Sequence, residues 1–523
     1  MPGLSSLHDP SKPDTIIKGY HTMGLIRLRG DSLAWTTIAS CSAAMLLFGY
    51  DQGVMSGLIT SDSFKQEIFG TLNPSTSISG LVVAIYEIGA FVGAVSKRVP
   101  VADDQNTGQL LGRRWTTAIG QVIIIIGAAL QASSHGLGQM ITARVITGVG
   151  MGQVTATVPV WNAEIARASY RGKAGACLSL CAVTGLVISY WVDYAASFYS
   201  SDFSYRFPLS LQILFCLLQL STIPFLPESP RWLMAKNRDA KATDIILAIS
   251  DAESLESSAE AAAMVADIKF ALENESDGLS AWKEMFTMGP LQYFRRILLA
   301  FGIQAMQQLT GINVIAYYST VIFKQSVHMS DHLALLMGGF VSLAFFAGTV
   351  ISIPIIDSFG RRPLIMYGLA CTCIGMTITA IGTSKDTFSY GVAATFGVFF
   401  FNFNFGIGFQ ATAWLYGVEV TPLKLRHFSG AIAAASGWIW NYAVVQVTQP
   451  GIQSIGYKYF IVWAVLNFTW FWVIFFFYPE TARKTLEELD FIFMDPDDLP
   501  QVKGEHFEKE KERRVSEEHI EVV

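Results

Sequence analysis

Twelve stretches of mostly apolar residues recur along this chain, and they constrain its fold more than any other feature. A helix that crosses a bilayer needs about 20 such residues, because lipid cannot bond the backbone polar groups. The sequence therefore predicts an all-α, polytopic membrane protein with twelve transmembrane helices. We place them at 33–58, 77–96, 115–132, 140–161, 175–197, 207–226, 297–323, 333–356, 363–382, 389–416, 428–448 and 457–478.

The composition agrees with this class and excludes others. Only 15% of the residues are charged, against about 25% in soluble domains. The formal net charge of -6 leaves no basic footprint, so we expect no nucleic acid partner. The six cysteines lie in apolar runs and read as free thiols, without a metal-binding cluster. Phosphate-binding and Ser/His/Asp motifs are missing, so we expect no cofactor and no enzymatic activity.

The loops predict the orientation and the division of the chain. Those on one side carry 19 lysines and arginines and those on the other carry five, so both termini are expected in the cytoplasm. The long break in the middle separates two six-helix lobes, an arrangement typical of transporters with a site between the lobes. The predicted parts are a tail at 1–32, lobes at 33–226 and 297–478, a loop with short helices at 227–296, and a tail at 479–523.

Three short motifs occur once in each half, at matching positions near the predicted cytoplasmic side. Gly-Arg-Arg ends at 114 and at 362, a Glu lies seven residues before an Arg after helices 4 and 10, and Pro-Glu follows helices 6 and 12. We interpret these groups as ion pairs across the lobes that lock one conformation; anchoring by the positive-inside rule would explain the arginines but not the glutamates. The network comprises Arg113, Glu164, Arg171, Glu228, Arg231, Arg361, Glu419, Arg426 and Glu480.

The chain resembles the sugar porter family of the major facilitator superfamily, in its fungal branch. Besides the repeated motifs, the resemblance rests on Gly49-Tyr50-Asp51-Gln52-Gly53 and on the run Gln-Gln-Leu-Thr-Gly-Ile-Asn at 307–313. It extends from about Trp35 to Leu489. It implies a two-lobed carrier of sugars, which we expect to be a monomer in the plasma membrane.

One loop departs from this family. The acid usual before Gly-Arg-Arg is missing from Gly108-Gln109-Leu110-Leu111-Gly112, which removes one partner of the network. A polar stretch at 97–106 also lengthens the loop, and the second helix should then end at Ser96. We hypothesise that this stretch is a retained intron in the gene model, and sequencing the transcript would test it.

Carboxamides and aromatic rings inside the apolar runs are the candidate sugar ligands. Amides both donate and accept hydrogen bonds, as sugar hydroxyls do, and rings suit the apolar faces of a sugar. Polar residues that merely join helices, and tryptophans of the interfacial belt, are the alternatives. The candidates are Gln307, Gln308, Asn313, Trp414, Trp438, Asn441 and Ser179.

Three positions near these ligands differ from the family pattern. Ser179 and Gly437 stand where the family has Gln and Asn, which removes two carboxamides and leaves space for a larger solute unless neighbours fill it. Ala413 replaces the proline before Trp414, so helix 10 is expected to be straighter. Gly311, between the amides of helix 7, permits a local bend.

Asp51 and Arg144 predict proton coupling. A charge at mid-bilayer costs about 2.5–3.5 kcal/mol, so an acid within helix 1 needs a partner, and Arg144 in helix 4 is the obvious one. The resemblance implies that an acid at this position marks proton-coupled members, and a structural ion pair is the alternative. We predict proton symport of a monosaccharide across the bilayer, while a disaccharide symporter, a proton-independent facilitator and a non-transporting sensor remain alternatives.

Overall fold

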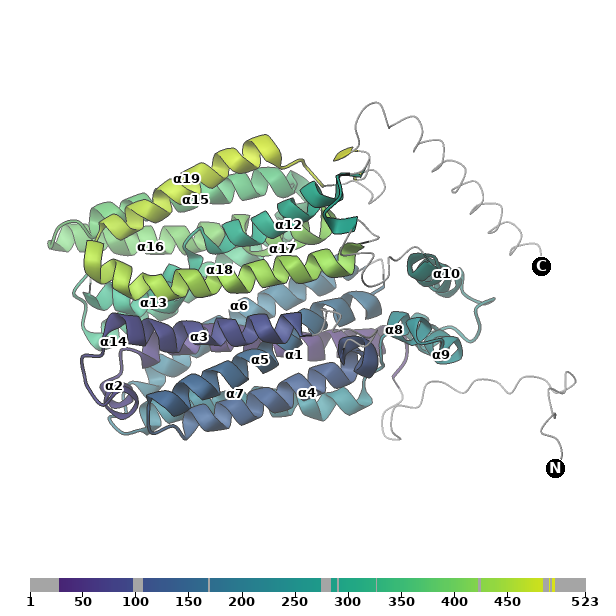
Figure 1. Ribbon diagram of the computed structural model, residues 1–523, viewed down its shortest axis with the longest axis horizontal. Helices are drawn as coiled ribbons and strands as arrows, with labels where there is room; N and C mark the ends of the chain where they lie inside the picture. Colours follow the sequence, from purple (N-terminus) through teal and green to yellow (C-terminus); the bar gives the residue numbers. More distant parts are fainter. Residues whose placement is uncertain are drawn as a thin grey trace, which may run out of the picture.

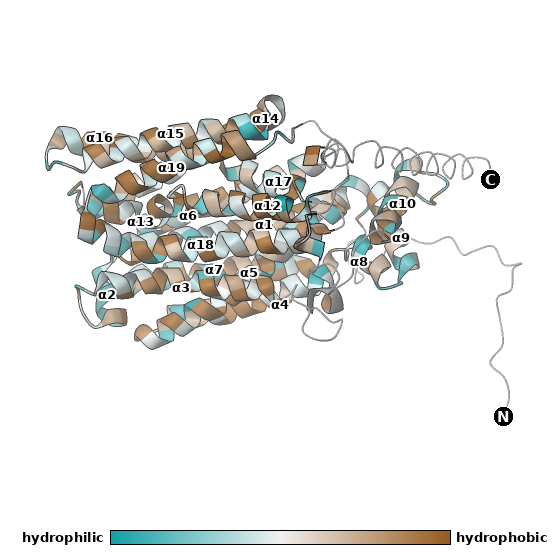
Figure 2. Cartoon of the chain, turned by 45° about the horizontal axis from the view of Figure 1, so that its top comes forward, coloured by the Kyte–Doolittle hydropathy of each residue, from teal (hydrophilic) through white to brown (hydrophobic). Residues whose placement is uncertain are grey.

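The long helices run side by side along the longest axis of the molecule, as the computed structural model shows (Figure 1). The structure describes residues 28–96, 107–167, 170–273, 284–288, 291–325, 327–421, 425–482, 489 and 492–493. Hydrophobic residues colour much of each long helix brown in Figure 2. The short helices α8, α9 and α10 lie beyond one end of the bundle, here called the loop end, and α2 lies at the opposite, far end (Figure 1).

Each half of the chain contributes one layer of helices. The first lobe and the linking segment contain α1 (Gly30–Leu58), α2 (Asp62–Phe69), α3 (Thr76–Val95), α4 (Thr107–Ala132), α5 (Leu137–Ile165), α6 (Arg171–Ala196), α7 (Phe203–Thr222), the 3-10 turn η1 (Ile223–Phe225), α8 (Pro230–Ala235), α9 (Asp239–Ser250) and α10 (Ala259–Glu273). The second lobe contains α12 (Tyr293–Gln308), α13 (Ile312–Gln325), α14 (Asp331–Phe359), α15 (Arg361–Gly382), α16 (Phe388–Gly408), α17 (Gln410–Glu419), α18 (Arg426–Ile455) and α19 (Lys458–Phe477).

The predicted all-α fold of twelve membrane helices is confirmed. Ten helical segments in the described part of the chain are long and apolar enough to cross a membrane. The remaining two predicted spans correspond to α5 and α18, which have 29 and 30 residues but many glycines and polar side chains. α3 ends at Val95, one residue before the expected end. The stretch at 97–106 lies outside the described residues.

Glycines let the helices of the first lobe approach closely. A Cβ atom on Gly49 of α1 would lie 1.6 Å from the carbonyl oxygen of Ala182 on α6, and one on Gly53 would lie 1.9 Å from Ser189 Oγ. Gly49 and Gly53 are four residues apart, the small-residue spacing that brings membrane helices into backbone contact. This contact fixes the position of Asp51, which lies between the two glycines in the chain.

We therefore expect Gly49→Val to abolish folding, because α1 and α6 would have to separate. Gly175→Val, on α6, is the matched control, since no heavy atom lies within 4 Å of a Cβ at that position. Size-exclusion chromatography of the fluorescently tagged chain in detergent would compare them. A single sharp peak for Gly49→Val, equal to that of Gly175→Val, would contradict this packing.

Two long helices of the second lobe are broken next to polar residues. Helix 7 is divided into α12 and α13 at Gly311, whose φ of +88° is disfavoured for residues with a side chain. The expected bend there is confirmed. Helix 10 is divided at Phe409 into α16 and α17, so the prediction of a straighter helix is wrong. The break does not require a proline, because Gly408 is pinned against the backbone of Gly368.

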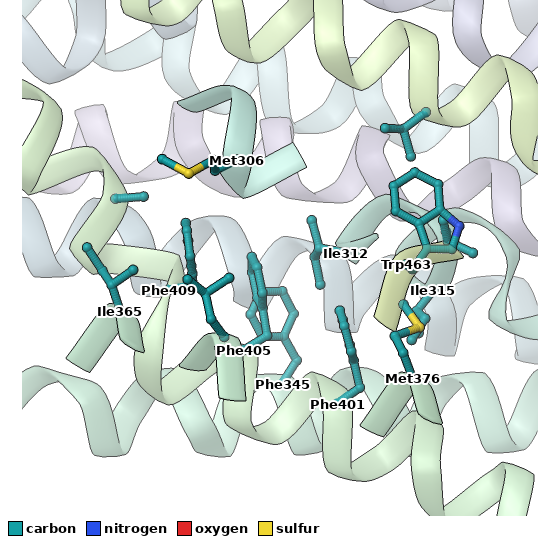
Figure 3. Close-up of a cluster of buried hydrophobic side chains, with 14 of the residues drawn as sticks. Met306, Ile312, Ile315, Phe345, Ile365, Met376, Phe401, Phe405, Phe409 and Trp463 are labelled. Atoms are coloured by element: carbon teal, nitrogen blue, oxygen red, sulfur yellow. The ribbon is translucent and has the colours of Figure 1, made fainter. Parts of the chain in front are cut away.

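Phenylalanines fill the second lobe between α14 and α16. Phe401, Phe405 and Phe409 follow one another at four-residue spacing and stack with ring centroids 6.1 and 5.8 Å apart. Phe345 meets Phe405 at 5.8 Å, and Figure 3 shows the four rings in a row. Phe345 and Phe405 of this row line the cavity described next.

Candidate functional site

A cavity of about 120 Å³ lies between the two lobes. Helices α1 and α6 of the first lobe and α12, α13, α14, α16, α17 and α18 of the second contribute to its wall. Six of the seven predicted sugar ligands meet there, although they come from four helices. They are Gln307, Gln308, Asn313, Trp414, Trp438 and Asn441.

The amides of the cavity have unused hydrogen-bonding capacity. Gln307 and Asn441 are buried, and their side-chain oxygens have no hydrogen-bond partner within the described residues. Gln308 Oε1 accepts from Asn313 Nδ2, which leaves the Gln308 amide nitrogen and the Asn313 oxygen to face a ligand. Buried polar atoms without partners are costly. A ligand that carries several hydroxyls would satisfy them.

Two tryptophans line the same cavity. Trp438 is buried, and its ring contacts Phe48 edge to face with centroids 5.8 Å apart. Trp414 is 42% exposed and lines the cavity from α17. Each residue thus contributes to the wall of the cavity.

Ser179 does not line the cavity. It lies on α6 one helical turn from Ala182, which does, and its side chain is half-buried toward the loop end. Gly437 does line it, and a Cβ atom there would lie 3.7 Å from Gln304 Oε1 and 3.9 Å from Gln308 Nε2. Neighbouring glutamines of α12 thus fill part of the space left by the missing asparagine.

Three carboxamides in or near the cavity wall were missed by the sequence analysis. Gln52 and Gln410 line it directly, and Gln304 lies behind Gly437 with its Oε1 buried and unbonded in the described structure. All three are carboxamides in apolar runs, and Gln52 directly follows Asp51. Gln304 lies in helix 7 itself, so the rule applied there would have found all three only if it had covered that whole helix as well as helices 1 and 10.

Asp51 and Arg144 form a buried ion pair. Arg144 Nη1 donates to Asp51 Oδ1 at 3.2 Å, and both side chains are completely buried. Arg144 Nη2 also donates to the carbonyl of Val83, and the guanidinium lies 4.6 Å from the ring centre of Tyr86. α1, α3 and α5 therefore meet at this pair. Asp51 precedes Gln52 in α1, so the pair lies one residue from the cavity wall.

Two matching ion clusters lie at the loop end, one in each lobe. Arg113 bonds Glu164 through Nε and Nη2, both at 3.0 Å. The backbone N–H of Arg113 donates to Glu228 at 2.8 Å. In the second lobe Arg361 bonds Glu419 through two nitrogens, at 3.2 and 3.0 Å, and its N–H donates to Glu480 at 3.0 Å.

Each of these ion pairs joins helices of one lobe. The sequence analysis had predicted pairs across the lobes, and the structure does not have that arrangement. Each Gly-Arg-Arg turn is held by the Pro-Glu carboxylate of its own half, because the positive φ of Gly112 and Gly360 directs backbone N–H groups toward it. Burial raises the pKa of Glu228 above its usual value, against the lowering effect of these N–H donors. Arg231 is the second residue of α8, and the side chains of Arg171 and Arg426 lie outside the described residues.

The far end of the bundle is closed by contacts between the lobes. α3 and α18 are joined there by Thr76 Oγ1, which donates to Gln453 Oε1 at 2.9 Å. α1 meets α13 where Ser56 Oγ and Thr320 Oγ1 lie 3.2 Å apart. α6 meets α13 where Tyr190 Oη and Ser319 Oγ lie 2.9 Å apart. The cavity is therefore covered from the far end.

The comparisons with known proteins agree with this arrangement. The family described as "Sugar (and other) transporter" matches residues 35–493. The chain is 34% identical over 464 residues to the MFS-type transporter oryC of Aspergillus oryzae, covering 87% of this chain and 84% of that protein. It is also 34% identical over 477 residues to Sugar transporter STL1 of Saccharomyces cerevisiae, covering 89% and 82%.

A solved structure shares the fold. The proton:xylose symporter XylE from E. coli, bound to 6-bromo-6-deoxy-D-glucose, superposes with a TM-score of 0.73 at 24% identity. The match covers 89% of this chain and all of the other. At this level of identity the likeness concerns the arrangement of the helices and not the ligand.

Proposed function

Because this chain belongs to the sugar porter family of the major facilitator superfamily, we propose that it carries a monosaccharide across a membrane together with a proton. The proposal rests on one observation above all. Amides from both lobes, several with free hydrogen-bonding atoms, and two tryptophans of the second lobe surround a single cavity that lies beside a buried Asp–Arg pair.

The cavity supports a sugar as the ligand. Its wall offers donors and acceptors close together, and no Lys, Arg, Asp or Glu is among the lining residues. An ionic solute would remain without a counter-charge there, whereas a neutral polyhydroxylated one would bond the amides and lay a face on an indole ring.

The size of the cavity favours one sugar ring over two. Sites for drug-sized ligands occupy about 300–1,000 Å³, and this cavity has about 120 Å³. The space expected at Gly437 is reduced by Gln304 and Gln308. A disaccharide would require the lobes to move farther apart, so it is the less favoured substrate.

The Asp51–Arg144 pair supports coupling to protons. A proton on Asp51 would weaken its bond to Arg144 and release α5 from α1, and loss of the proton would restore it. Asp51 is next to Gln52 of the cavity wall, so sugar binding and protonation act on the same helix. A facilitator would have no need for an ionisable acid at this depth.

We further propose that the loop end faces the cytoplasm of a cell whose plasma membrane holds this chain as a monomer. The excess of lysine and arginine in the loops of that end supports this orientation. With its far end closed, the structure then corresponds to a state that opens inward. The ion clusters of the loop end brace each lobe as it rocks about the cavity.

Uptake of radiolabelled sugars by yeast that lack their own transporters tests the proposal. We expect uptake of at least one monosaccharide and little uptake of disaccharides. Uptake of disaccharides alone would overturn the size argument, and absence of uptake from the whole panel would favour a sensor.

The substitution Gly437→Asn is expected to strengthen sugar binding. Its Cβ would make ordinary contacts, and its amide would enter the cavity beside Gln308. One added hydrogen bond of about 1 kcal/mol corresponds to a roughly fivefold lower KM. Concentration-dependent uptake measures KM, with Gly437→Ala as the control that adds volume without an amide. An equal change in both variants would contradict the role of the amide.

A further inference from the structure

Glu87 of α3 is a second buried acid, and the proposed mechanism does not use it. Its side chain is completely buried, and no ion pair of Glu87 occurs in the described part of the chain. Tyr317 of α13, in the other lobe, donates its hydroxyl to Glu87 Oε1 at 2.7 Å. The same hydroxyl also contacts Gln52 Oε1 of the cavity wall. One phenol thus connects both lobes, the cavity and a carboxyl group.

The hydrogen count at Tyr317 depends on whether Glu87 carries a proton. A phenol has one hydrogen, and here it lies between two acceptor oxygens. If Glu87 is protonated, its own hydrogen bonds the tyrosine oxygen, and the tyrosine hydrogen bonds Gln52. Each of the three oxygens, Tyr317 Oη, Glu87 Oε1 and Gln52 Oε1, then takes part in a hydrogen bond. If Glu87 is ionised, the tyrosine hydrogen bonds the carboxylate, and Gln52 Oε1, in the orientation that the amide has here, receives none from the phenol.

The surroundings of Glu87 also suit the neutral acid. Its second oxygen, Oε2, is buried and accepts no hydrogen bond from the described residues. The charged groups that face it are Asp51 from α1 and Arg144 from α5, and these already bond one another. Tyr86 is the neighbour of Glu87 on α3. Beyond the first turn of α18, Tyr442 is the one titratable residue of that helix. An ionised Glu87 would therefore be a buried charge without its own partner.

We propose that protonation of Glu87 permits closure of the far end, with Tyr317 as the element that senses it. This inference rests on the alternating access of the proposed function. When the far end is open, Tyr317 has withdrawn with its lobe, water reaches the carboxyl, and the proton exchanges with that water. Closure buries the group and keeps the proton on it. Glu87 is thus a gating group, separate from the proton that Asp51 carries.

A disulfide between the lobes reports closure without any substrate. Ser56 Oγ and Thr320 Oγ1 are 3.2 Å apart across the far end, so the double variant Ser56→Cys and Thr320→Cys places two sulfurs within bonding reach. The full chain in membrane vesicles is oxidised over a range of about pH 5 to 8, with and without Glu87→Gln. The glutamine imitates the neutral acid. Both chains carry the same two cysteines, so the ratio of their oxidation rates removes the pH dependence of the thiols themselves.

We expect the chain that keeps Glu87 and the Glu87→Gln chain to cross-link at equal rates at low pH. As the pH rises, the chain that keeps Glu87 should cross-link progressively more slowly, by up to about tenfold per pH unit for one linked proton. At high pH the Glu87→Gln chain should therefore cross-link faster than the chain that keeps Glu87. Tyr317→Phe, which cannot bond the carboxyl, should reduce the difference between the two and leave only the part that comes from burial of the charge. A ratio of rates that is constant over the range would overturn the proposal.

The result is independent of the proposed function, because no sugar is present. A chain that failed to take up sugar with protons could still show the pH-dependent cross-link. Conversely, sugar uptake with alkalinisation and a pH-independent ratio would leave symport intact and remove Glu87 from gating.

Discussion

Replacing Asp51 with asparagine should abolish accumulation of sugar while leaving exchange intact. Asparagine keeps the size of the side chain but cannot take up and release a proton, so the two sugar gradients can only equalise. One charge moving down 100 mV supplies about 2.3 kcal/mol, or roughly 50-fold accumulation. We therefore expect the ratio of internal to external sugar to fall from tens to about one.

The measurement must separate lost coupling from lost folding. Arg144 keeps its bond to the Val83 carbonyl and its position beside Tyr86 when the Asp51 carboxylate is removed, so α5 should stay attached to α3. Equilibrium exchange of labelled sugar, which needs no net proton movement, should remain within a few-fold of the unmodified chain. Full accumulation against a gradient by Asp51→Asn would return the pair to a structural role.

Replacing Gln307 with leucine should raise KM for sugar by about 5- to 150-fold. The Gln307 oxygen is buried at the cavity with no hydrogen bond in the described structure, so its loss costs the empty protein little. A bound sugar hydroxyl would lose its partner, at about 1–3 kcal/mol. Concentration-dependent uptake gives KM, and thermal unfolding of the tagged protein gives its stability.

Gln219 provides the matched control for Gln307. It is also a buried glutamine in a membrane helix, but it bonds Gln121 of α4 and the backbone carbonyl of Ser40 in α1, away from the cavity. Gln219→Leu should lower the unfolding temperature and leave KM unchanged. The two variants should thus show opposite patterns. A KM for Gln307→Leu close to that of the unmodified chain would place this amide among residues that only join helices.

The helices could be predicted from the sequence because lipid imposes a simple condition on composition. Runs of about twenty apolar residues suffice to locate them, and even α5 and α18 were found, although their glycines and polar residues lower their hydropathy. The bend at Gly311 was predictable for a similar reason, since glycine is the residue that tolerates its positive φ. The break at Phe409 was not, because it depends on how Gly408 packs against another helix.

The site was predictable in type but not in its connections. Buried carboxamides pointed to Gln307, Gln308, Asn313 and Asn441, and the structure gathers them around one cavity. Pairing is a three-dimensional property, however. Arg113 and Arg361 were expected to reach across the lobes, and each instead bonds a carboxylate of its own lobe.

Glu87 shows the same limit. A single acid in an apolar helix gives no sign in the sequence that a tyrosine 230 positions later will meet it. Its companion Tyr317 lies beyond the amide run that drew attention to helix 7. The contact depends on how the two lobes close, which the order of residues along the chain does not encode locally.

The external pH of a lightly buffered suspension of transporter-deficient yeast expressing this chain tests the central claim most directly. Addition of the transported monosaccharide should make the medium more alkaline at once, because each sugar enters with a proton, and cells expressing Asp51→Asn should show no such change. Uptake of the same sugar with a flat pH trace would contradict proton symport and make the chain a facilitator.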